Sequence, residues 1–426
     1  VCFWSLNLRI YNESKLFMKI CIKGVENKLI NKSVFISGSK SESNRLLILQ
    51  QLFSRITISN LSDSDDTHHL QHALSTQDSE INIGHAGTAM RFLTAFFAAQ
   101  KNRTVILSGS DRMHNRPIKI LVDALKDLGA EISYVDKEGY PPLKITGKEL
   151  KENKVQINGN VSSQYISALL LIASSLPEGL TVELLGEITS IPYIKMTLSL
   201  LNQIGIETSF EGQTIQVKPH QNSKQQDLVV ESDWSSASYF YSIIALSDIG
   251  SEIRLSSYKK QSLQGDAVLA DIYEHFGVST TFDENSIILK KVAESKKELL
   301  QLDLNKAPDI AQTIAVTCFG LGVSCDLDGL HTLKIKETDR LEALKNELTK
   351  LGAIISVTND SLYLEGSSKI ISNVSIETYN DHRMAMAFAP LAILMPINIL
   401  DANVVTKSYR NFWEDLQQIG FQLNKA

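Results

Sequence analysis

A segment near the N-terminus has the composition of a loop that binds phosphate. In "SVFISGSKSESNRLLILQ", residues 33–50, a β-branched run leads through a turn of small residues containing Lys40 into an apolar helical pattern. This segment is not a nucleotide P-loop, because a P-loop carries a second glycine further upstream and its lysine directly follows the last glycine. The free N–H groups at a helix start favour anions. The segment therefore predicts a phosphate site and leaves open whose phosphate it holds.

Cations stand at the starts of several other expected helices. The eight cations at such positions are Lys40, Arg45, Arg91, Arg116, Lys336, Arg340, Arg383 and Lys407. They are accompanied by Ser41, Gly87, Thr88, Ser162, Ser163, Gln164, Ser190, Tyr193 and His382. A lone cation on a helix is usually solvated, and a serine at a helix start is usually an N-cap. Eight cations at corresponding positions, in a chain with a formal net charge of −6, nevertheless predict one site for a small polyanion.

Two carboxylates, Asp309 and Glu337, lie among these cations in the sequence. Cationic neighbours favour the ionised form of a carboxyl group, so either residue could accept a proton at neutral pH. Arg91 lies inside the otherwise apolar "GTAMRFLTAFF", where an unpaired charge would be costly, and we expect it to meet an anion or a carboxylate. The predicted chemistry is proton transfer on a ligand with phosphate and carboxylate groups.

The chain repeats itself at intervals of about 73 residues. Helical patterns that are apolar nearly all round begin at Gly87, Ser162, Ser235, Pro308 and Asp381. Each is followed by an amphipathic pattern that ends in a glycine before a strand, at Gly129, Gly205, Gly277, Gly352 and Gly420. A shorter opening unit places "SESNRLLILQQLF" before "DTHHLQHALST", with a capping box formed by Ser39 and Glu42. Six α+β units predict two domains of three units, with sheets wrapped around buried helices.

Composition narrows the class of protein. The chain has 426 residues, 43% of them hydrophobic and 21% charged, which suits a globular protein with two or more cores. The net negative charge argues against nucleic-acid binding, and the longest uncharged run, "MAMAFAPLAILMPINIL", is too short to span a bilayer comfortably. Four cysteines without metal or disulfide spacing fit a reducing cytosol. His68 and His72 could ligate a metal, but the expected third ligand is missing. Residues 1–17 are expected to be an extension outside the fold.

Several motifs together resemble one enzyme family. "SGSKSESNR", "GHAGTAMR", "DRMHNRPI", "VSSQYISALL", "SIPYI", "PDIAQTIA", "KETDRL" and "NDHRMAMA" occur in the order found in 5-enolpyruvylshikimate-3-phosphate synthases. The resemblance covers about residues 20–425. It implies a two-domain inside-out α/β barrel with three repeated units in each domain. The implied first domain comprises residues 18–37 and 232–426, the second comprises residues 38–231, and the active site lies in the cleft between them.

The resemblance implies that the chain transfers the enolpyruvyl group of phosphoenolpyruvate to the 5-hydroxyl of shikimate 3-phosphate, releasing phosphate, in the shikimate pathway to aromatic amino acids. The residues implied to bind shikimate 3-phosphate are Lys40, Ser41, Arg45, Ser162, Ser163, Gln164, Ser190, Tyr193, Asp309 and Lys336. Those implied to bind phosphoenolpyruvate are Lys40, Gly87, Arg116, Gln164, Arg340, Arg383 and Lys407. Domain closure would make the site dry, so that the cations act strongly on the departing phosphate.

Catalytic roles are implied for three residues. Asp309 would take the proton of the attacking hydroxyl, Glu337 would protonate the enol methylene, and Lys40 would share the proton transfer. The tetrahedral adduct formed in this way then collapses. The resemblance implies no metal and no organic cofactor, and we expect a cytoplasmic monomer that binds neither nucleic acid nor membrane.

Four residues depart from the family pattern. Ser37 stands where proline usually precedes "GSKS", which could loosen the turn, and Thr332 stands where some members place an asparagine on the substrate phosphate. His85 replaces the asparagine of "GNAGTAMR" beside the phosphoenolpyruvate pocket, and Phe92 replaces the proline after "AMR". The last change puts the fit of the competing inhibitor glyphosate in doubt. None of the four removes a charged catalytic group.

Three other functions are to be weighed against this one. The sister enzyme that transfers enolpyruvyl to UDP-N-acetylglucosamine shares the fold, but it generally carries a reactive cysteine on the loop aligned with "GSDRMHNRPI". This chain has no cysteine from residue 22 to residue 317. A catalytically dead module that binds phosphorylated sugars or acids would not require Asp309 and Glu337. An enzyme acting on nucleic-acid ends would be expected to have a more basic surface.

Overall fold

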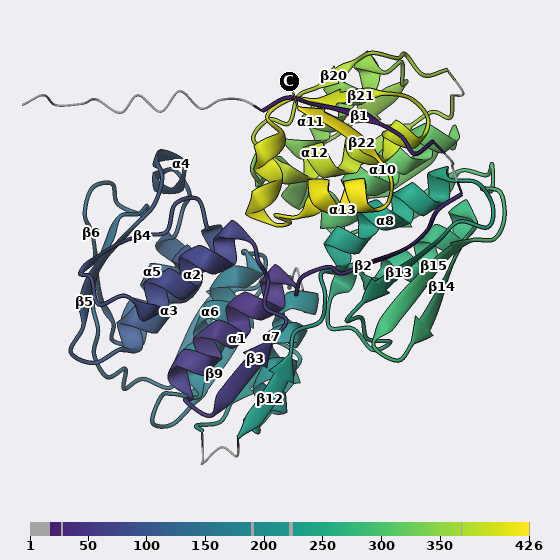
Figure 1. Ribbon diagram of the computed structural model, residues 1–426. Coiled ribbons are helices and arrows are strands. Elements are labelled where there is room, and N and C mark those ends of the chain that lie inside the picture. Colours follow the sequence, from purple (N-terminus) through teal and green to yellow (C-terminus); the bar gives the residue numbers. More distant parts are fainter. Residues whose placement is uncertain (1–17, 27–28, 189–190, 221–224, 368, 426) are drawn as a thin grey trace, which may run out of the picture.

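The computed structural model describes residues 18–26, 29–188, 191–220, 225–367 and 369–425 (Figure 1). The predicted N-terminal extension, residues 1–17, and the predicted site residue Ser190 lie outside this part of the chain. None of the helices in the described part combines the length and apolar character needed to cross a membrane.

The strands of the described residues form six sheets, five of which share one order of pairing. In one of them, β4 (Glu80–Asn82) runs parallel to β5 (Thr104–Ser108). β5 pairs antiparallel with β7 (Leu143–Thr146), which in turn pairs antiparallel with β6 (Glu131–Tyr134). One parallel pairing followed by two antiparallel pairings therefore defines the repeated unit.

Four more sheets repeat this order. In hydrogen-bonding order their strands are β8 (Lys154–Asn158), β9 (Leu180–Leu185), β11 (Thr214–Val217) and β10 (Thr208–Glu211); β2 (Asn31–Val34), β13 (Glu252–Ser256), β15 (Ser286–Lys291) and β14 (Val278–Asp283); β16 (Leu300–Asp303), β17 (Cys325–Asp328), β19 (Leu362–Leu364) and β18 (Ile355–Val357); β20 (Ser375–Ile376), β21 (Ile397–Ile399), β1 (Ile20–Lys23) and β22 (Gln422–Lys425). The sixth sheet has two parallel strands, β3 (Ile56–Ser59) and β12 (Gln226–Val229), and belongs to the short opening unit. The predicted repeat is confirmed.

Each unit contributes one helix that is buried on most of its surface, as the apolar patterns predict. These helices are α1 (Lys40–Leu52), α3 (Gly87–Ala99), α6 (Ser163–Ala173), α8 (Trp234–Leu246), α10 (Ala311–Leu321) and α12 (His382–Phe388), the last continued by η5 (Ala389–Ile393). Figure 1 shows α1, α3 and α6 together in one lobe and α8, α10 and α12 together in the other.

The apolar side chains form two separate cores. Core A takes its buried residues from positions 20–36 and 234–421, and core B takes its buried residues from positions 46–230. The chain passes between the two cores twice, and the two passages lie side by side. Gly38 forms an isolated antiparallel bridge with Ser232, and the Ser39 amide donates to the Glu231 carbonyl at 2.8 Å. The domain boundaries implied by the family remain a prediction.

The second helix of each unit is only partly buried, as the amphipathic patterns predict. These helices are α2 (Asp65–Ser75), α5 (Lys119–Asp127), α7 (Ile191–Gln203), α11 (Arg340–Lys350) and α13 (Phe412–Gln418); in one unit η1 (Gly265–Val268), α9 (Leu269–Ile272) and η2 (Tyr273–Phe276) take this place. All five glycines predicted to end these helices have positive φ angles, between 74° and 113°. The remaining short helices are α4 (Asp111–His114), η3 (Pro308–Ile310), η4 (His331–Ile335) and η6 (Ala402–Lys407).

The capping box predicted at the start of α1 is wrong. Ser39 occupies the N-cap position, but its side chain caps no amide of the helix. Glu42 turns away from the helix start, and its Oε2 accepts a hydrogen bond of 3.3 Å from the Glu231 amide. The Glu231 amide, which lies nearby in the fold but far away in the sequence, thus takes the place of the Ser39 amide as the donor to Glu42.

Candidate active site

Arg340, the first residue of α11, joins three carboxylates. Its side chain is 2% exposed, and it contacts Asp309 at 2.9 Å, Glu337 at 2.8 Å and Asp381 at 2.7 Å. A buried guanidinium offers five N–H donors in a rigid plane, so three carboxylates hold it in one orientation. Arg340 therefore brings together the two carboxylates that the sequence marks as proton acceptors.

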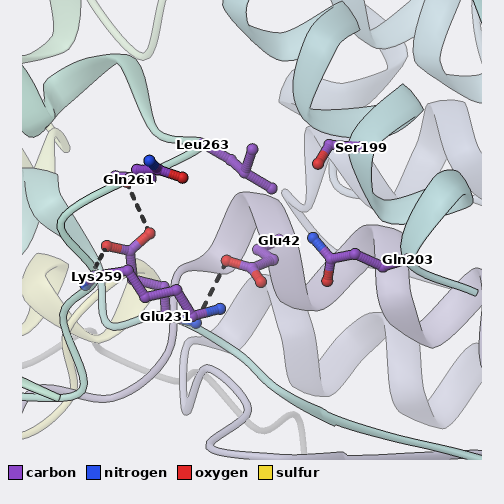
Figure 2. A pocket seen from close by; sticks show the side chains of 8 residues that line it. Glu42, Ser199, Gln203, Glu231, Lys259, Gln261 and Leu263 are labelled. Atoms are coloured by element: carbon purple, nitrogen blue, oxygen red, sulfur yellow. Dashed lines mark hydrogen bonds between the residues drawn. The ribbon is translucent and has the colours of Figure 1, made fainter. Parts of the chain in front are cut away.

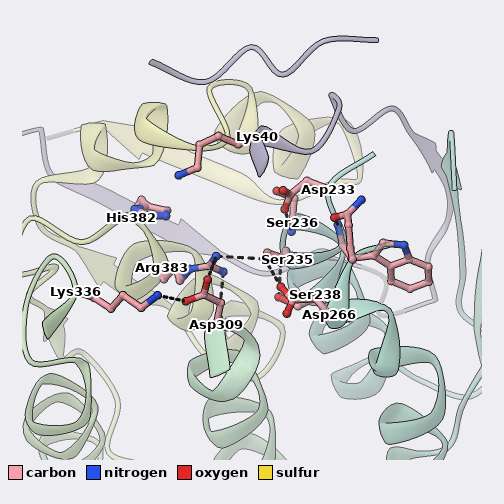
Figure 3. Close-up of polar contacts among 12 residues, drawn as sticks. Lys40, Asp233, Ser235, Ser236, Ser238, Asp266, Asp309, Lys336, His382 and Arg383 are labelled. Atoms are coloured by element: carbon pink, nitrogen blue, oxygen red, sulfur yellow. Dashed lines mark hydrogen bonds and ion pairs between the residues drawn. The ribbon is translucent and has the colours of Figure 1, made fainter. Parts of the chain in front are cut away.

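Asp309 lies in η3, just before α10, and faces three cations, two of which, Lys336 and Arg383, are labelled in Figure 3. Its carboxylate is 3.5 Å from Lys336, 2.9 Å from Arg340 and 3.3 Å from Arg383. Burial opposes ionisation of this group, but the three cations outweigh burial and hold the pKa of Asp309 well below its usual range. The side chain is an ionised carboxylate, which can accept a proton.

Glu337 lies in the short segment between η4 and α11. Its side chain forms ion pairs with Arg340 and with Lys407, the last residue of η6, and its backbone carbonyl accepts from Arg112 of α4. Burial acts to raise the pKa of Glu337, whereas Arg340, Lys407 and His382 lower it, and the net pKa lies well below the usual range. In this state Glu337 is ionised, so it must gain a proton before it can donate one.

Arg383 is the second residue of α12 and adds a second link to Asp309. Its amide donates to the N-cap Asp381 at 2.9 Å, and its Nη1 donates to the Asp309 carbonyl at 3.1 Å. Ser235, in the first turn of α8, accepts from Arg383 Nη2 at 3.2 Å. Two buried helices of core A thus fix one cation.

On the side of core B, Lys40 begins α1 and lies 3.6 Å from Asp66 of α2. Figure 3 shows Lys40 extending from a different segment toward the cluster that contains His382 and Arg383. Burial is the main cause that lowers the pKa of Lys407. The negative charge of Asp66 raises this pKa and the positive charge of Lys40 lowers it. Residues from both cores therefore share one electrostatic environment.

Arg45 is fully engaged by groups of the protein. It donates to Thr197 Oγ1 at 2.8 Å, to Ser167 Oγ at 3.0 Å and to the Ser41 carbonyl at 2.7 Å. The rings of Phe92 and Tyr193 lie 5.4 and 5.9 Å from its guanidinium carbon. Burial lowers the pKa of Arg45 to about 10, so it stays charged at neutral pH. Arg45 holds the first turn of α1 against the start of α7, and Phe92 forms part of its enclosure.

The helix starts of α3 and α6 also meet. Gln164 Nε2 donates to Thr88 Oγ1 at 3.1 Å, and the Ser162 hydroxyl caps the Gln164 amide at 3.4 Å. Ser163 is buried at the first position of α6. A Cβ atom on Gly87 would lie 2.4 Å from Nη1 of Arg116, so any other residue at this position would displace the end of the Arg116 side chain.

The described residues provide no carboxylate partner for Arg91, and the anion that the sequence gives as its other possible partner stays a prediction. Arg91 is buried, but no carboxylate of the described residues contacts it; its Nη1 donates to the Gly87 carbonyl at 3.0 Å and its Nη2 to the Pro117 carbonyl at 3.3 Å. Burial, helped by Arg116, lowers the pKa of Arg91 to about 10. Arg91 therefore fixes the backbone on both sides of the Gly87–Arg116 contact.

The predicted residues fall into two groups. Asp309, Lys336, Glu337, Arg340, Arg383 and Lys407 form one connected network on core A. Lys40, Ser41, Arg45, Gly87, Arg116, Ser162, Ser163, Gln164 and Tyr193 belong to elements of core B. Among the described residues no three His, Cys, Asp or Glu side chains gather in a way that could hold a metal ion.

Several residues that shape the site are missed by the sequence reasoning. They are Asp65, Asp66, Arg112, Asp266, Asp381 and Arg410. Asp65 accepts from Thr406 at 2.7 Å and forms an ion pair with Arg410 at 2.5 Å, which joins α2 to the segment around Lys407. Asp65 and Asp66 in "SDSDDTHH" and Asp381 in "NDHRMAMA" stand at helix starts. That position is the signal by which the sequence could have indicated these three residues.

Comparison with known proteins identifies the family. The family model described as EPSP synthase (3-phosphoshikimate 1-carboxyvinyltransferase) matches residues 72–416. The 3-phosphoshikimate 1-carboxyvinyltransferase of Bacteroides fragilis is 47% identical over 397 residues, which cover 92% of this chain and 96% of that protein. The chain belongs to the EPSP synthase family. The protein of the same name from Mannheimia haemolytica is 36% identical over 424 residues, covering 92% of this chain and 97% of that protein.

Solved structures of the EPSP synthase fold agree. The EPSP synthase of Acinetobacter baumannii superposes with a TM-score of 0.78 at 21% identity, covering 96% of this chain and 100% of that one. The enolpyruvyl transferase NikO of Streptomyces tendae superposes with a TM-score of 0.71 at 13% identity, covering 96% and 99% of the two chains. At these identities the superpositions establish the fold alone. The two-domain inside-out α/β fold and the EPSP synthase family, both predicted from the motifs, are confirmed.

Proposed function

We propose that this chain is a 3-phosphoshikimate 1-carboxyvinyltransferase, which transfers the enolpyruvyl group of phosphoenolpyruvate to the 5-hydroxyl of shikimate 3-phosphate and releases phosphate. The observation that carries the proposal is the network that includes Arg340, in which three carboxylates and four cations meet. The names of the curated relatives support the same reaction.

Substrate binding is assigned to the residues of the family motifs. Shikimate 3-phosphate would lie against Lys40, Ser41, Arg45, Ser162, Ser163, Gln164, Ser190, Tyr193, Asp309 and Lys336. Phosphoenolpyruvate would lie against Lys40, Gly87, Arg116, Gln164, Arg340, Arg383 and Lys407. Forked guanidinium groups suit both the carboxylate and the phosphate of phosphoenolpyruvate. Besides this contact, Arg45 holds Ser41 and Tyr193 in place through hydrogen bonds to their carbonyl groups.

The first chemical step needs a base and an acid. Asp309, ionised in the structure, accepts the proton of the 5-hydroxyl while that oxygen bonds to C2 of phosphoenolpyruvate. Glu337, with Lys40, supplies a proton to the C3 methylene, and a tetrahedral adduct results. In the second step the bond between C2 and the phosphate oxygen breaks and C3 loses a proton, which leaves the enol ether and free phosphate.

Substrate charge offers a way to protonate Glu337. Burial raises the pKa of this residue, but the positive charges of Arg340 and Lys407 lower it by more, so the net pKa is low. An anionic substrate that draws Arg340 and Lys407 to itself weakens those ion pairs. The balance then shifts toward burial, and the pKa of Glu337 rises so that it can carry a proton.

The remaining expectations belong to the same proposal. A reaction confined to proton transfer and charge stabilisation uses side chains that the network supplies, so we expect full activity in the presence of a metal chelator. We also expect a cytoplasmic monomer. The lack of cysteine between residues 22 and 317 argues against UDP-N-acetylglucosamine as the acceptor.

Phosphate release tests the proposal. Purified protein is mixed with phosphoenolpyruvate and either shikimate 3-phosphate or UDP-N-acetylglucosamine, without added metal. Release with shikimate 3-phosphate alone is expected, together with its loss in Asp309→Asn and its retention in the matched variant Glu365→Gln, which alters an exposed carboxylate. A folded protein that binds shikimate 3-phosphate but releases no phosphate would instead be a binding module.

A further inference from the structure

Asp266 is a buried carboxyl group for which the proposed mechanism has no role. It lies in η1 and is 7% exposed. Its Oδ2 accepts a hydrogen bond from the hydroxyl of Ser235, in the first turn of α8. In the part of the chain that the structure describes, no ion pair holds this carboxyl group.

Ser235 connects Asp266 to the reaction site. A serine hydroxyl has one hydrogen, and Ser235 donates it in the hydrogen bond to Asp266, so the lone pairs of its oxygen remain free to accept from other donors. Arg383 Nη2 is such a donor, at 3.2 Å, and the same nitrogen lies 3.3 Å from Asp309 Oδ2. Figure 3 shows the row formed by Asp266, Ser235, Arg383 and Asp309. By fixing the direction of the Ser235 O–H bond, Asp266 turns a lone pair of the hydroxyl oxygen toward Arg383.

We propose that Asp266 is a positioning residue for phosphoenolpyruvate, because through the Ser235 hydroxyl it holds the Arg383 guanidinium in the orientation that receives this substrate. The inference rests on the proposed function, in which Arg383 binds phosphoenolpyruvate. Asp266 is linked to Arg383 only through Ser235, so its role is one of positioning.

The charge of Asp266 strengthens this arrangement. The charged and titratable groups around it are Asp309, Arg383, Asp233 and Tyr193. Burial, followed by the negative charge of Asp309, raises the pKa of Asp266 to about 6. Above this pH the ionised carboxylate is a strong acceptor for Ser235, and below it the neutral acid is a weaker one. Binding of phosphoenolpyruvate should therefore weaken as the pH falls through this range.

Asp266→Asn and Ser235→Ala test the proposal by steady-state kinetics. The net free energy of a hydrogen bond to a charged group corresponds to roughly a tenfold change in an equilibrium constant. We expect either variant to raise KM for phosphoenolpyruvate about tenfold at pH 7.5 and to leave KM for shikimate 3-phosphate unchanged. Since both residues act through one hydroxyl, the double variant should be no worse than either single variant.

The pH dependence separates positioning from a general structural effect. At pH 5.5 a group with a pKa of about 6 is roughly three-quarters protonated in the wild type. The ratio of KM for phosphoenolpyruvate between Asp266→Asn and wild type should then fall from about tenfold to about threefold. A merely structural role would leave this ratio constant.

Each outcome decides the matter. Equal KM values for wild type and Asp266→Asn, a parallel rise of both KM values, or additive effects in the double variant would overturn the proposal. If Asp266→Asn does not fold, Ser235→Ala, which removes a single hydroxyl, must show the same selective rise. A wild-type protein that releases no phosphate would refute the proposed function, whereas an active wild type with unaffected variants refutes only the role of Asp266.

Discussion

Glu42 should make the stability of this protein depend on pH. Its carboxyl group lies in a cavity of about 330 Å³ at the place where the chain passes between the two cores, next to Glu231 (Figure 2). Burial raises the pKa of Glu42 to about 7; Lys259 opposes this rise, and the negative charge of Glu231 adds to it. Glu231 accepts hydrogen bonds from Trp234 Nε1, the Lys259 amide, Ser262 Oγ and Gln264 Nε2.

The magnitude follows from the difference in pKa between the unfolded and the folded protein. The ordinary pKa of a glutamate carboxyl group is 4.5 and that of Glu42 in the folded protein is about 7, so the folded state binds the proton more tightly. Each pKa unit is equivalent to about 1.4 kcal/mol, which gives a difference of about 3 kcal/mol. Because the folded pKa is raised, the contribution to stability is fully present below pH 4.5 and is lost as the pH rises through about 7.

Urea unfolding of wild type and Glu42→Gln, at pH 5 and at pH 8, measures this effect. The glutamine side chain of the variant cannot ionise, so the variant should gain up to about 3 kcal/mol relative to wild type between the two pH values. With a slope of roughly 3 kcal/mol per M of urea, this corresponds to a shift of about 1 M in the unfolding midpoint. The control is Glu207→Gln, which changes an exposed glutamate. If wild type and Glu42→Gln respond equally to pH, the carboxyl group is not held neutral by its surroundings, and the reasoning fails.

Three further outcomes test the site. Glu337→Gln should lower the rate of phosphate release at least about 1,000-fold, while the Kd for shikimate 3-phosphate measured by calorimetry changes little; a large loss of affinity would mean that Glu337 organises the site and does not donate the proton. Arg91→Lys should lower thermal stability by about 2 kcal/mol, because a lysine cannot reach both carbonyl groups that Arg91 binds, and an unchanged Tm would contradict this. Phe92→Leu should raise KM for shikimate 3-phosphate about fivefold, since the ring that lies 5.4 Å from the Arg45 guanidinium contributes about 1 kcal/mol; equal KM values in both proteins would show that the ring does not support Arg45.

The repeat and the family could be predicted from the sequence because both depend on local patterns. A helix buried on all sides must be apolar on all sides, so "SSQYISALLLIAS" predicts α6 without reference to any other segment. A glycine after an amphipathic helix predicts a left-handed cap, and Gly205 and Gly352 have φ angles of 85° and 100°. The motifs that carry the family are likewise short and contiguous.

The partners of the polar side chains could not be predicted in the same way. Arg91 meets the carbonyls of Gly87 and Pro117, and a backbone carbonyl leaves no mark in a sequence. Glu42 reaches Glu231, 189 positions away, in place of the cap at its own helix start. A local rule compares neighbours in the chain, whereas burial makes a side chain take whichever partner the packing brings near.

The sequence by itself determined the elements, their order and the kinds of groups at the helix starts. Only the tertiary structure decided that Arg340 would bind Asp309, Glu337 and Asp381 at once, and that Asp266 would reach Arg383 through Ser235. The physical reason lies in the range of the two effects. Hydrophobic periodicity acts along a few turns of chain, but a hydrogen bond requires two atoms to lie within about 3 Å. Segments such as those of Arg340 and Asp309, 31 positions apart, or Arg383 and Ser235, 148 positions apart, attain that separation only when core A has packed.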